Sequence, residues 1–474
     1  MTTLHISLVG RTDLIGEIYR QIRQAILEGK LKPGERLPPT RVLAKSLSVS
    51  RSTVTAAYEQ LLGEGLASSR IGAATYVSEE AAALRRNASR ATKRASLRTR
   101  AVWTSIPPGI AFNRMPFDFG LGVPDITLFP HEAWRQSVVR AMRSDELQRA
   151  TYESPAGLRS LRDAIVDHIG VSRAVDASAD DVMITNGTQQ ALDIVARALL
   201  EPGDTIAVEN PGYGPPRHLF RSLGARVVGV PVDMEGIVVD RIPANARVVY
   251  VTPSHQFPLG VPMSLTRRRA LLAWADQHDA AIVEDDYDSE FRFGGRPLEP
   301  LQTLDVSGRV IYIGSFSKTM LPALRLGFLV MPSSIREVMV KAKFVTDWHS
   351  STLVQGGLAQ FMSAGHFARH LRKASRVYRE RHEIISEVLR KDFREHLELV
   401  PSSTGLHMAA LATRASVEAM LSFVAQAATK GVAIQHLAAY SSGTQPRAGI
   451  TLGYGGIATA RIREGLRRMR TCLK

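Results

Sequence analysis

The 474-residue sequence predicts an α/β protein in which a small, mainly helical N-terminal domain is joined by a linker to a large domain with a mostly parallel sheet. The chain is too long for a single hydrophobic core, so two or three domains are expected. Near the N-terminus apolar residues recur at helical spacing, whereas after residue 115 short β-branched runs alternate with helical stretches. Residues 79–115, between these parts, show no apolar periodicity.

Composition narrows the class of protein. A hydrophobic fraction of 45% with 22% charged residues is ordinary for a globular protein. No apolar run approaches the roughly 20 residues that span a bilayer, and the first residues do not form a secretory signal. The single cysteine, Cys472, excludes an intrachain disulfide and a multi-cysteine metal site. We therefore expect a cytoplasmic protein with no membrane partner and no metal site.

The positive charge of the chain is concentrated at its N-terminal end. Residues 1–100 contain 17 Lys and Arg against 8 Asp and Glu, so +9 of the total net charge of +15 lies there. Such a field attracts a polyanion, although basic segments also serve solubility.

The N-terminal domain, residues 11–78, is predicted to hold three helices and a two-stranded wing. Isoleucines at 15, 18, 22 and 26, together with Tyr19, give the first helix one apolar face. Thr40 is expected to cap the second helix, and Ser50 or Ser52 the third. Residues 68–77 can then fold back as the wing.

The start of the third helix offers Arg51, Ser52 and Thr53 on the side away from its apolar residues. Short polar and cationic side chains at a helix start reach base edges and phosphates in the major groove. Double-stranded DNA is therefore the predicted partner. The alternative is a small helical domain that binds another protein.

Residues 14–78 resemble the winged helix-turn-helix of the GntR regulators, whose pattern matches Gly34 to Ala44, Val49 to Leu61 and Gly72 to Val77. Two departures are Pro39-Thr40 in place of the usual serines and Ala74 in place of the second wing glycine. The resemblance implies that DNA is contacted by Arg36, Arg41, Ser50, Arg51, Ser52, Thr53 and Arg70.

The linker, residues 79–115, is strongly basic. Seven Lys and Arg residues occur from Arg85 to Arg100 with no acidic residue among them. The run is typical of a solvated tether, either a simple flexible linker or one that touches DNA phosphates without sequence preference.

In the large domain, residues 116–474, five strands are expected near residues 181–184, 205–208, 248–251, 281–283 and 310–313. Ligand chemistry in parallel α/β sheets gathers at the carboxyl ends of the strands. After the first of these strands comes Asn186-Gly187-Thr188-Gln189, which opens a helix and offers backbone N–H groups to a phosphate. Tyr213 follows the next strand in a turn and can stack on a flat ring.

Two further motifs complete a candidate site. Asp285 directly follows a buried strand, where a carboxylate can keep a pyridine nitrogen protonated, and Tyr287 is spaced to reach a phenolic oxygen on the same ring. Lys318 follows Ser315 and Ser317, and a desolvated lysine at the end of a strand is nucleophilic toward an aldehyde. Each motif alone is commonly structural, but the ordered set favours a cofactor site.

Residues 116–474 resemble the class I fold-type aminotransferases, which bind pyridoxal 5'-phosphate (PLP), and the whole chain resembles the MocR subfamily of GntR regulators. The implied fold is a winged helix-turn-helix joined by a linker to a fold-type I, PLP-dependent aminotransferase-like domain. The resemblance implies an aldimine at Lys318, pyridine pairing by Asp285, a phenolic-oxygen contact by Tyr287 and ring stacking by Tyr213. It implies phosphate contacts by Gly187, Thr188, Gln189, Ser315, Ser317 and Arg325, with Tyr152 lent to the partner subunit's phosphate. In the loop 253–260, His255 or Gln256 replaces the usual asparagine.

One departure concerns the ligand's carboxylate. Thr451 occupies the place where aminotransferases usually carry a carboxylate-binding arginine, and Arg447 is the nearby alternative. A homodimeric regulator that senses PLP or an amino compound through Lys318 would tolerate this change better than an efficient transaminase. The alternatives are a working aminotransferase with an accessory DNA-binding module and a repressor whose large domain is only a dimerisation scaffold.

Overall fold

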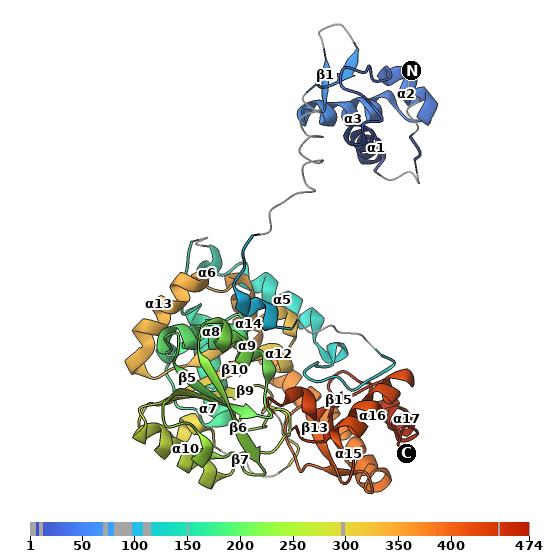
Figure 1. Ribbon diagram of the computed structural model, residues 1–474. Helices are drawn as coiled ribbons and strands as arrows, with labels where there is room; N and C mark the ends of the chain where they lie inside the picture. Colours follow the sequence, from blue (N-terminus) through green and yellow to red (C-terminus); the bar gives the residue numbers. More distant parts are fainter. Residues whose placement is uncertain are drawn as a thin grey trace. The chain divides into compact units, whose positions relative to one another are not determined.

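The chain forms two compact units, residues 1–100 and residues 101–474, in a computed structural model (Figure 1). The structure describes residues 6–8, 13–69, 74–79, 97–107, 115–148, 151–294, 299–443 and 446–473. The second unit thus begins at Ala101, inside the range expected to be a linker. Arg70 and the basic residues from Arg85 to Arg94 lie outside the described residues.

The first unit is a winged helix-turn-helix, as predicted. It consists of α1 (Leu14–Glu28), α2 (Thr40–Leu47), α3 (Arg51–Gly63) and the antiparallel strands β1 (Ala67–Ser69) and β2 (Thr75–Val77). Residues 35–37 extend the wing, because the Leu37 amide donates to the Thr75 carbonyl and the Val77 amide to that of Glu35. The helices enclose a core that includes Ile18, Ile22, Ile26, Leu43, Val54, Tyr58 and Leu61.

The helix starts differ in one respect from expectation. Ser50 caps α3, since its hydroxyl accepts a hydrogen bond of 3.1 Å from the Thr53 amide. The prediction for Thr40 is wrong, because Pro39 is the N-cap of α2 and makes no side-chain cap. Thr40 is instead the first helical residue.

The second unit is built on an eight-stranded sheet in the order β4-β11-β10-β9-β8-β5-β6-β7. The strands are β4 (Val182–Thr185), β5 (Thr205–Asn210), β6 (Arg226–Asp233), β7 (Gly236–Ile237), β8 (Ala246–Val251), β9 (Ala281–Asp286), β10 (Val310–Ser315) and β11 (Gly327–Val330). The five strands from β10 to β6 in this order are parallel, whereas β11 and β7 run antiparallel to their neighbours. All five expected strands are present, and the α/β fold class is confirmed.

Helices cover both faces of this sheet (Figure 1). Side chains of alternate strand residues pack on one face with α8 (Thr188–Leu199), α9 (Gly214–Ser222) and α13 (Arg336–Asp347). The other face packs with α7 (Arg159–Arg173), α10 (Leu265–Gln277) and α14 (Thr352–Ser363). Shorter or peripheral helices are α5 (His131–Ala141), α6 (Asp145–Gln148), α11 (Leu301–Leu304) and α12 (Phe316–Thr319).

A C-terminal subdomain completes the second unit. The four-stranded sheet has the order β12 (Leu397–Leu399), β13 (His407–Ala412), β16 (Gly449–Gly453) and β15 (Gln435–His436), all antiparallel. It packs with α15 (His366–Asp392), α16 (Val417–Thr429) and α17 (Thr459–Arg470). The start of the unit joins it, because β3 (Phe117–Asp118) pairs with β14 (Val432–Ala433). Among the described residues, no helix is long and apolar enough to cross a membrane.

Candidate cofactor site and DNA-binding surface

Strand β9 delivers three consecutive carboxylates to opposite faces of the sheet. Because side chains alternate along a strand, Asp285 points to one face and Glu284 and Asp286 to the other. Asp286 forms an ion pair of 2.8 Å with the Arg173 guanidinium and accepts a hydrogen bond of 2.7 Å from the Tyr312 hydroxyl. Glu284 accepts bonds of 3.0 Å from the amides of Leu301 and Gln302. These two carboxylates therefore hold neighbouring elements, which leaves Asp285 as the one on the face of Lys318.

Asp285 is buried and only partly satisfied. Its Oδ2 accepts a hydrogen bond of 2.7 Å from the Tyr250 hydroxyl, while its Oδ1 has no partner. Burial raises the pKa of Asp285 to about 7, and the Tyr250 bond and Lys318 only partly oppose this. A buried carboxylate with one vacant oxygen matches a cationic N–H donor.

Lys318 lies in α12, directly after β10, and its amine is directed into the protein. Nζ donates to the Gly122 carbonyl at 2.8 Å. Burial lowers the pKa of Lys318, and the carboxylates of Asp288 and Asp285 oppose that effect. A lowered pKa increases the neutral amine fraction, which is the form that attacks an aldehyde.

An anion cradle lies at the N-terminus of α8. Gly187 is the N-cap residue, with a φ of 84°, and a Cβ added there would lie 3.1 Å from the Arg325 guanidinium. Arg325 donates to the Asn186 carbonyl at 2.6 Å, so its charge sits beside the free amides of Thr188 and Gln189. In register, Ser315 of β10 lies opposite Gly327 of β11, whose added Cβ would be 2.9 Å from Gly187. The geometry brings the predicted phosphate residues together.

Ser315 and Ser317 belong to the turn that presents Lys318. The Ser315 hydroxyl accepts a bond of 3.1 Å from the Ser317 amide. The four-residue helix α12 starts there and is tied back to the sheet by the Phe316 amide, which donates to the Leu326 carbonyl.

The aromatic residues form one group beside these polar ones. The ring of Tyr213 lies 5.3 Å from that of Phe257, edge to face, and burial raises the pKa of Tyr213, with Asp285 adding to the effect. The Tyr287 hydroxyl donates 2.8 Å to the His255 carbonyl and lies 3.3 Å from His255 Nδ1.

His255 and Gln256, the two candidates in the loop, have different surroundings. The Gln256 amide nitrogen donates to the carbonyls of Pro211 and Phe257 at 2.9 and 2.7 Å, and its oxygen accepts from the Leu259 amide. Gln256 therefore holds the loop. His255 is the one in contact with Tyr287.

Three residues of the predicted ligand set lie apart from Lys318 or in other roles. Tyr152 is 76% exposed, with its ring 4.2 Å from that of Trp348. Thr451 is fully buried in β16, where its hydroxyl lies 3.5 Å from the Gln435 carbonyl and also interacts with the Tyr440 hydroxyl. Arg447 donates to the Val232 carbonyl.

Four residues of this site were not predicted from the sequence. Gly122 accepts from the lysine, Tyr250 supports Asp285, and Asp288 and His407 lie beside His255. Asp288 had a detectable signal, because it follows Asp285 in the same polar run after a buried strand.

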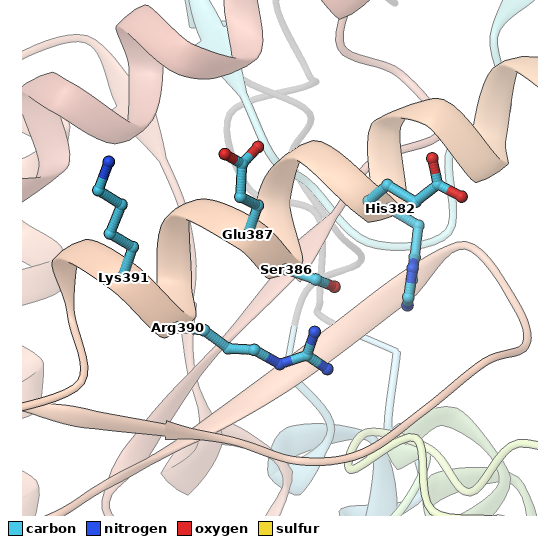
Figure 2. Close-up of a pocket in the computed structure, with 6 residues that line it drawn as sticks. His382, Ser386, Glu387, Arg390 and Lys391 are labelled. Atoms are coloured by element: carbon cyan, nitrogen blue, oxygen red, sulfur yellow. The ribbon is translucent and has the colours of Figure 1, made fainter.

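A surface hollow lies elsewhere, along α15. It measures about 540 Å³ and is lined by His382, Glu383, Ser386, Glu387, Arg390 and Lys391 (Figure 2). Glu387 is paired with Arg463 at 2.7 Å, and His382 Nε2 lies 3.0 Å from the Ser402 carbonyl. The hollow is formed by one helix with mixed charges and contains none of the residues around Lys318.

The first unit presents its predicted DNA-contacting residues on the surface. Arg36, Arg41 and Arg51 are exposed, and none of them makes an ion pair with a described residue. At the start of α3 the Ser50 hydroxyl lies 2.7 Å from those of Ser52 and Thr53. The α3 start thus combines hydroxyl groups with a free guanidinium.

Comparison with known proteins places both units. The family described as Bacterial regulatory proteins, gntR family, matches residues 14–77, and Aminotransferase class I and II matches residues 118–468. The chain is 38% identical to the probable rhizopine catabolism regulatory protein MocR of Rhizobium meliloti, over 96% of this chain and 92% of that protein. It is 32% identical to the pyridoxine biosynthesis transcriptional regulator PdxR of Corynebacterium glutamicum, over 94% of this chain and 92% of that protein.

Among solved structures, kynurenine aminotransferase of Pyrococcus horikoshii superposes with a TM-score of 0.70 at 28% identity, covering 76% of this chain and 91% of that one. LysN, the α-aminoadipate aminotransferase of Thermus thermophilus, superposes with a TM-score of 0.67 at 28% identity, covering 75% of this chain and 92% of that one. The chain therefore belongs to the MocR-type GntR regulators, in which a GntR helix-turn-helix domain is fused to an aminotransferase class I and II domain.

Proposed function

We propose that this protein is a homodimeric transcriptional regulator that binds an operator through its winged helix-turn-helix and senses PLP or an amino compound through Lys318. The observation that carries the proposal is the juxtaposition of the Lys318 amine, the vacant oxygen of Asp285 and the anion cradle at Gly187 on the carboxyl side of one sheet. The relatives with matching architecture are named as transcriptional regulators.

The residues around Lys318 fit PLP. When bound, PLP supplies an aldehyde, which condenses with an amine and releases water, and a pyridine ring that withdraws electrons. Asp285 Oδ1 would accept from the pyridine N–H, because this oxygen is buried and lacks a donor. Arg325 and the first amides of α8 would hold the phosphate. Tyr213 would lie against the ring and Tyr287 near its phenolic oxygen, and the solved LysN complex contains a phosphopyridoxyl group in a related fold.

The surroundings of Lys318 favour sensing over rapid amino transfer. Thr451 is neutral and buried, and Arg447 is engaged with the Val232 carbonyl. A ligand carboxylate would therefore meet no arginine at position 451, and at Arg447 it would meet only the N–H groups that do not bond Val232. An amino compound that displaces Lys318 and then stays bound suits a regulator.

A dimer would complete the site. Tyr152 lies in a surface group of aromatic side chains with Trp348 and Phe344, which are 43% and 44% exposed. Contiguous exposed aromatic and aliphatic groups mark interaction surfaces. In a dimer formed through this group, Tyr152 would reach the phosphate of the partner subunit.

The regulatory step requires that the effector bind two states of the dimer with different affinity. A tenfold preference shifts their balance by about 1.4 kcal/mol, and a ligand without preference shifts nothing.

The test is footprinting of the DNA upstream of the protein's own gene, with PLP and candidate amines titrated while cofactor absorbance is recorded. Protection of a defined site that changes with PLP or an amine is the expected result. Multiple turnover of an amino acid and a 2-oxo acid, with no footprint, would assign the chain to aminotransferases. A footprint without any cofactor absorbance would leave the large unit as a scaffold and contradict the sensing role.

A further inference from the structure

Three side chains, His255, Asp288 and His407, form a buried polar cluster beside Tyr287 to which the proposed function assigns no part. His255 Nδ1 lies 3.1 Å from both carboxylate oxygens of Asp288 and 3.3 Å from the Tyr287 hydroxyl. The ring of His407 lies 4.3 Å from that of His255. His255, Asp288 and His407 are each 2% exposed or less. Such groups are costly to bury, so their arrangement requires a reason.

The cluster ties two parts of the second unit together. His255 belongs to the loop after β8, and Asp288 follows β9, both in the large sheet. Asp288 Oδ2 accepts a hydrogen bond of 3.0 Å from the amide of Leu406, which directly precedes β13 in the C-terminal subdomain. Gly405 has a φ of 86°, and a Cβ there would meet His255 Nδ1 at 2.1 Å and Asp288 Oδ2 at 2.5 Å. The segment 405–407 is therefore packed directly against the His255–Asp288 pair.

Hydrogen bonding and burial decide which atoms of the two histidines carry protons. Because His255 Nδ1 faces a carboxylate, it carries the proton, and Nε2 is left without a partner. Burial lowers the pKa of His407 to about 3, so His407 is neutral and packs as a flat, uncharged ring. The other titratable groups that interact electrostatically with His255 or Asp288 include Asp285, Glu290, Lys318, His382 and Tyr454. Asp288 thus accepts hydrogen bonds from the His255 N–H and the Leu406 amide, and it also interacts electrostatically with Lys318.

We propose that Asp288 and His255 are positioning residues that hold the Tyr287 hydroxyl against the phenolic oxygen of PLP. The inference rests on the proposed PLP site. Asp288 orients the His255 ring, and the His255 carbonyl and Nδ1 together hold the hydroxyl oxygen at 2.8 and 3.3 Å. The His407 ring packs against both His255 and Tyr287, at 4.3 and 6.4 Å, and the Leu406 amide links the C-terminal subdomain to Asp288. Movement of that subdomain would therefore change the surroundings of the cofactor ring.

The same three residues have ligand atoms within 4.8 Å of one another, which is close enough for a metal ion. Two observations favour the hydrogen-bonded arrangement. Asp288 already accepts from His255 and from a backbone amide, and His255 Nδ1 has the carboxylate as its partner. Metal content is nevertheless one arm of the test.

The test compares D288N, H255Q and H407Q with H168Q, the loss of a half-buried histidine elsewhere in the second unit. His168 also has an unpartnered Nε2, but it packs against Phe367 in a different cluster. We expect D288N and H255Q to weaken PLP binding about tenfold and to shift the apparent pKa of the cofactor absorbance band by about one unit. H168Q should lower the melting temperature and leave the band and its pH titration unchanged.

A double-mutant cycle with Y287F separates positioning from general stability. If Asp288 acts through Tyr287, D288N should shift the band in the Y287F background by less than about a third of the shift that it causes in the wild type. Full additivity of the two changes would overturn the proposal, as would one equivalent of metal that is lost in H407Q and D288N. If the wild type shows a normal cofactor band and D288N does not shift its apparent pKa, the positioning role is contradicted and the proposed function is not. A wild-type protein with no band contradicts the proposed function, and this inference with it.

Discussion

Tyr250 and Asp285, on the neighbouring parallel strands β8 and β9, are joined by a hydrogen bond of 2.7 Å from the tyrosine hydroxyl to Asp285 Oδ2. The bond satisfies one carboxylate oxygen and leaves the other buried and vacant. Strand register is its cause, because Tyr250 lies opposite Val283 and therefore on the same face as Asp285. Asp285 thus has a buried oxygen that can accept a hydrogen bond from a cationic donor.

This arrangement predicts how Asp285→Asn changes stability in the absence of PLP. Burial raises the pKa of Asp285 to about 7, so the folded chain keeps a proton that the unfolded chain loses near pH 4. The wild type therefore loses stability as pH rises from about 4 to about 7, and no further above that. D285N lacks this loss, so its stability relative to the wild type should increase by about 1–4 kcal/mol between pH 5 and pH 8.

Urea unfolding at both pH values measures the difference. Glu209 and Glu290, whose pKa values burial raises to about 7 and about 8, are present in both proteins and cancel. A difference that stays flat with pH would contradict the assignment of the raised pKa to Asp285. With PLP bound, the wild type should be more stable than D285N, because only the wild type offers a charge to the pyridine nitrogen.

Much of the fold could be predicted because its signals are local. The β-branched runs of β4, β5, β8, β9 and β10 and the isoleucine face of α1 depend on residues a few positions apart. The antiparallel β11 was not predicted, since strand direction depends on the path of the chain between Ser315 and Gly327. Thr40 was misassigned because Pro39, directly before it, already fixes the backbone at the N-cap.

The site was predictable only where motif order reflects chemistry. Asp285, Lys318 and Gly187 stand at the ends of strands, where ligand groups gather. The contacts of Lys318 with Gly122, and of Asp288 with Leu406, join residues 196 and 118 positions apart. No spacing rule connects such pairs. His407 was missed for the same reason, because it belongs to the C-terminal sheet.

Lys318→Ala should abolish covalent retention of PLP. After reduction with borohydride, the wild type should gain the mass of one phosphopyridoxyl group per chain, and K318A should gain none, because Lys318 has the buried, deprotonation-prone amine. Mass spectrometry of the peptides locates the group. Lys341→Ala, at an exposed lysine paired with Glu337, is the control and should label normally. Full labelling of K318A would move the site to another lysine.

Arg51→Ala should weaken binding to the footprinted site by about tenfold to a hundredfold, the cost of one base or phosphate contact of about 1–3 kcal/mol. Arg51 is exposed at the start of α3, beside the hydroxyls of Ser50 and Ser52. Arg23→Ala removes a cation of α1 that is paired with Glu64 at 3.4 Å, and it should change affinity less than about threefold. Gel-shift titration at two salt concentrations measures both. Equal losses in the two variants would mean that charge alone, and not the α3 start, decides affinity.

Mixed dimers test whether Tyr152 serves the partner subunit. Tyr152→Ala should weaken PLP binding about tenfold in a homodimer, since both phosphates lose a hydroxyl, and Lys318→Ala should bind no PLP covalently. In a dimer of one Y152A and one K318A chain, the Y152A chain keeps its lysine and receives Tyr152 from the other chain. One site of wild-type affinity per dimer is therefore expected, measured by PLP titration of differently tagged, co-purified chains. If Tyr152 acted within its own chain, the mixed dimer would contain no intact site, and its single lysine would bind as weakly as in Y152A.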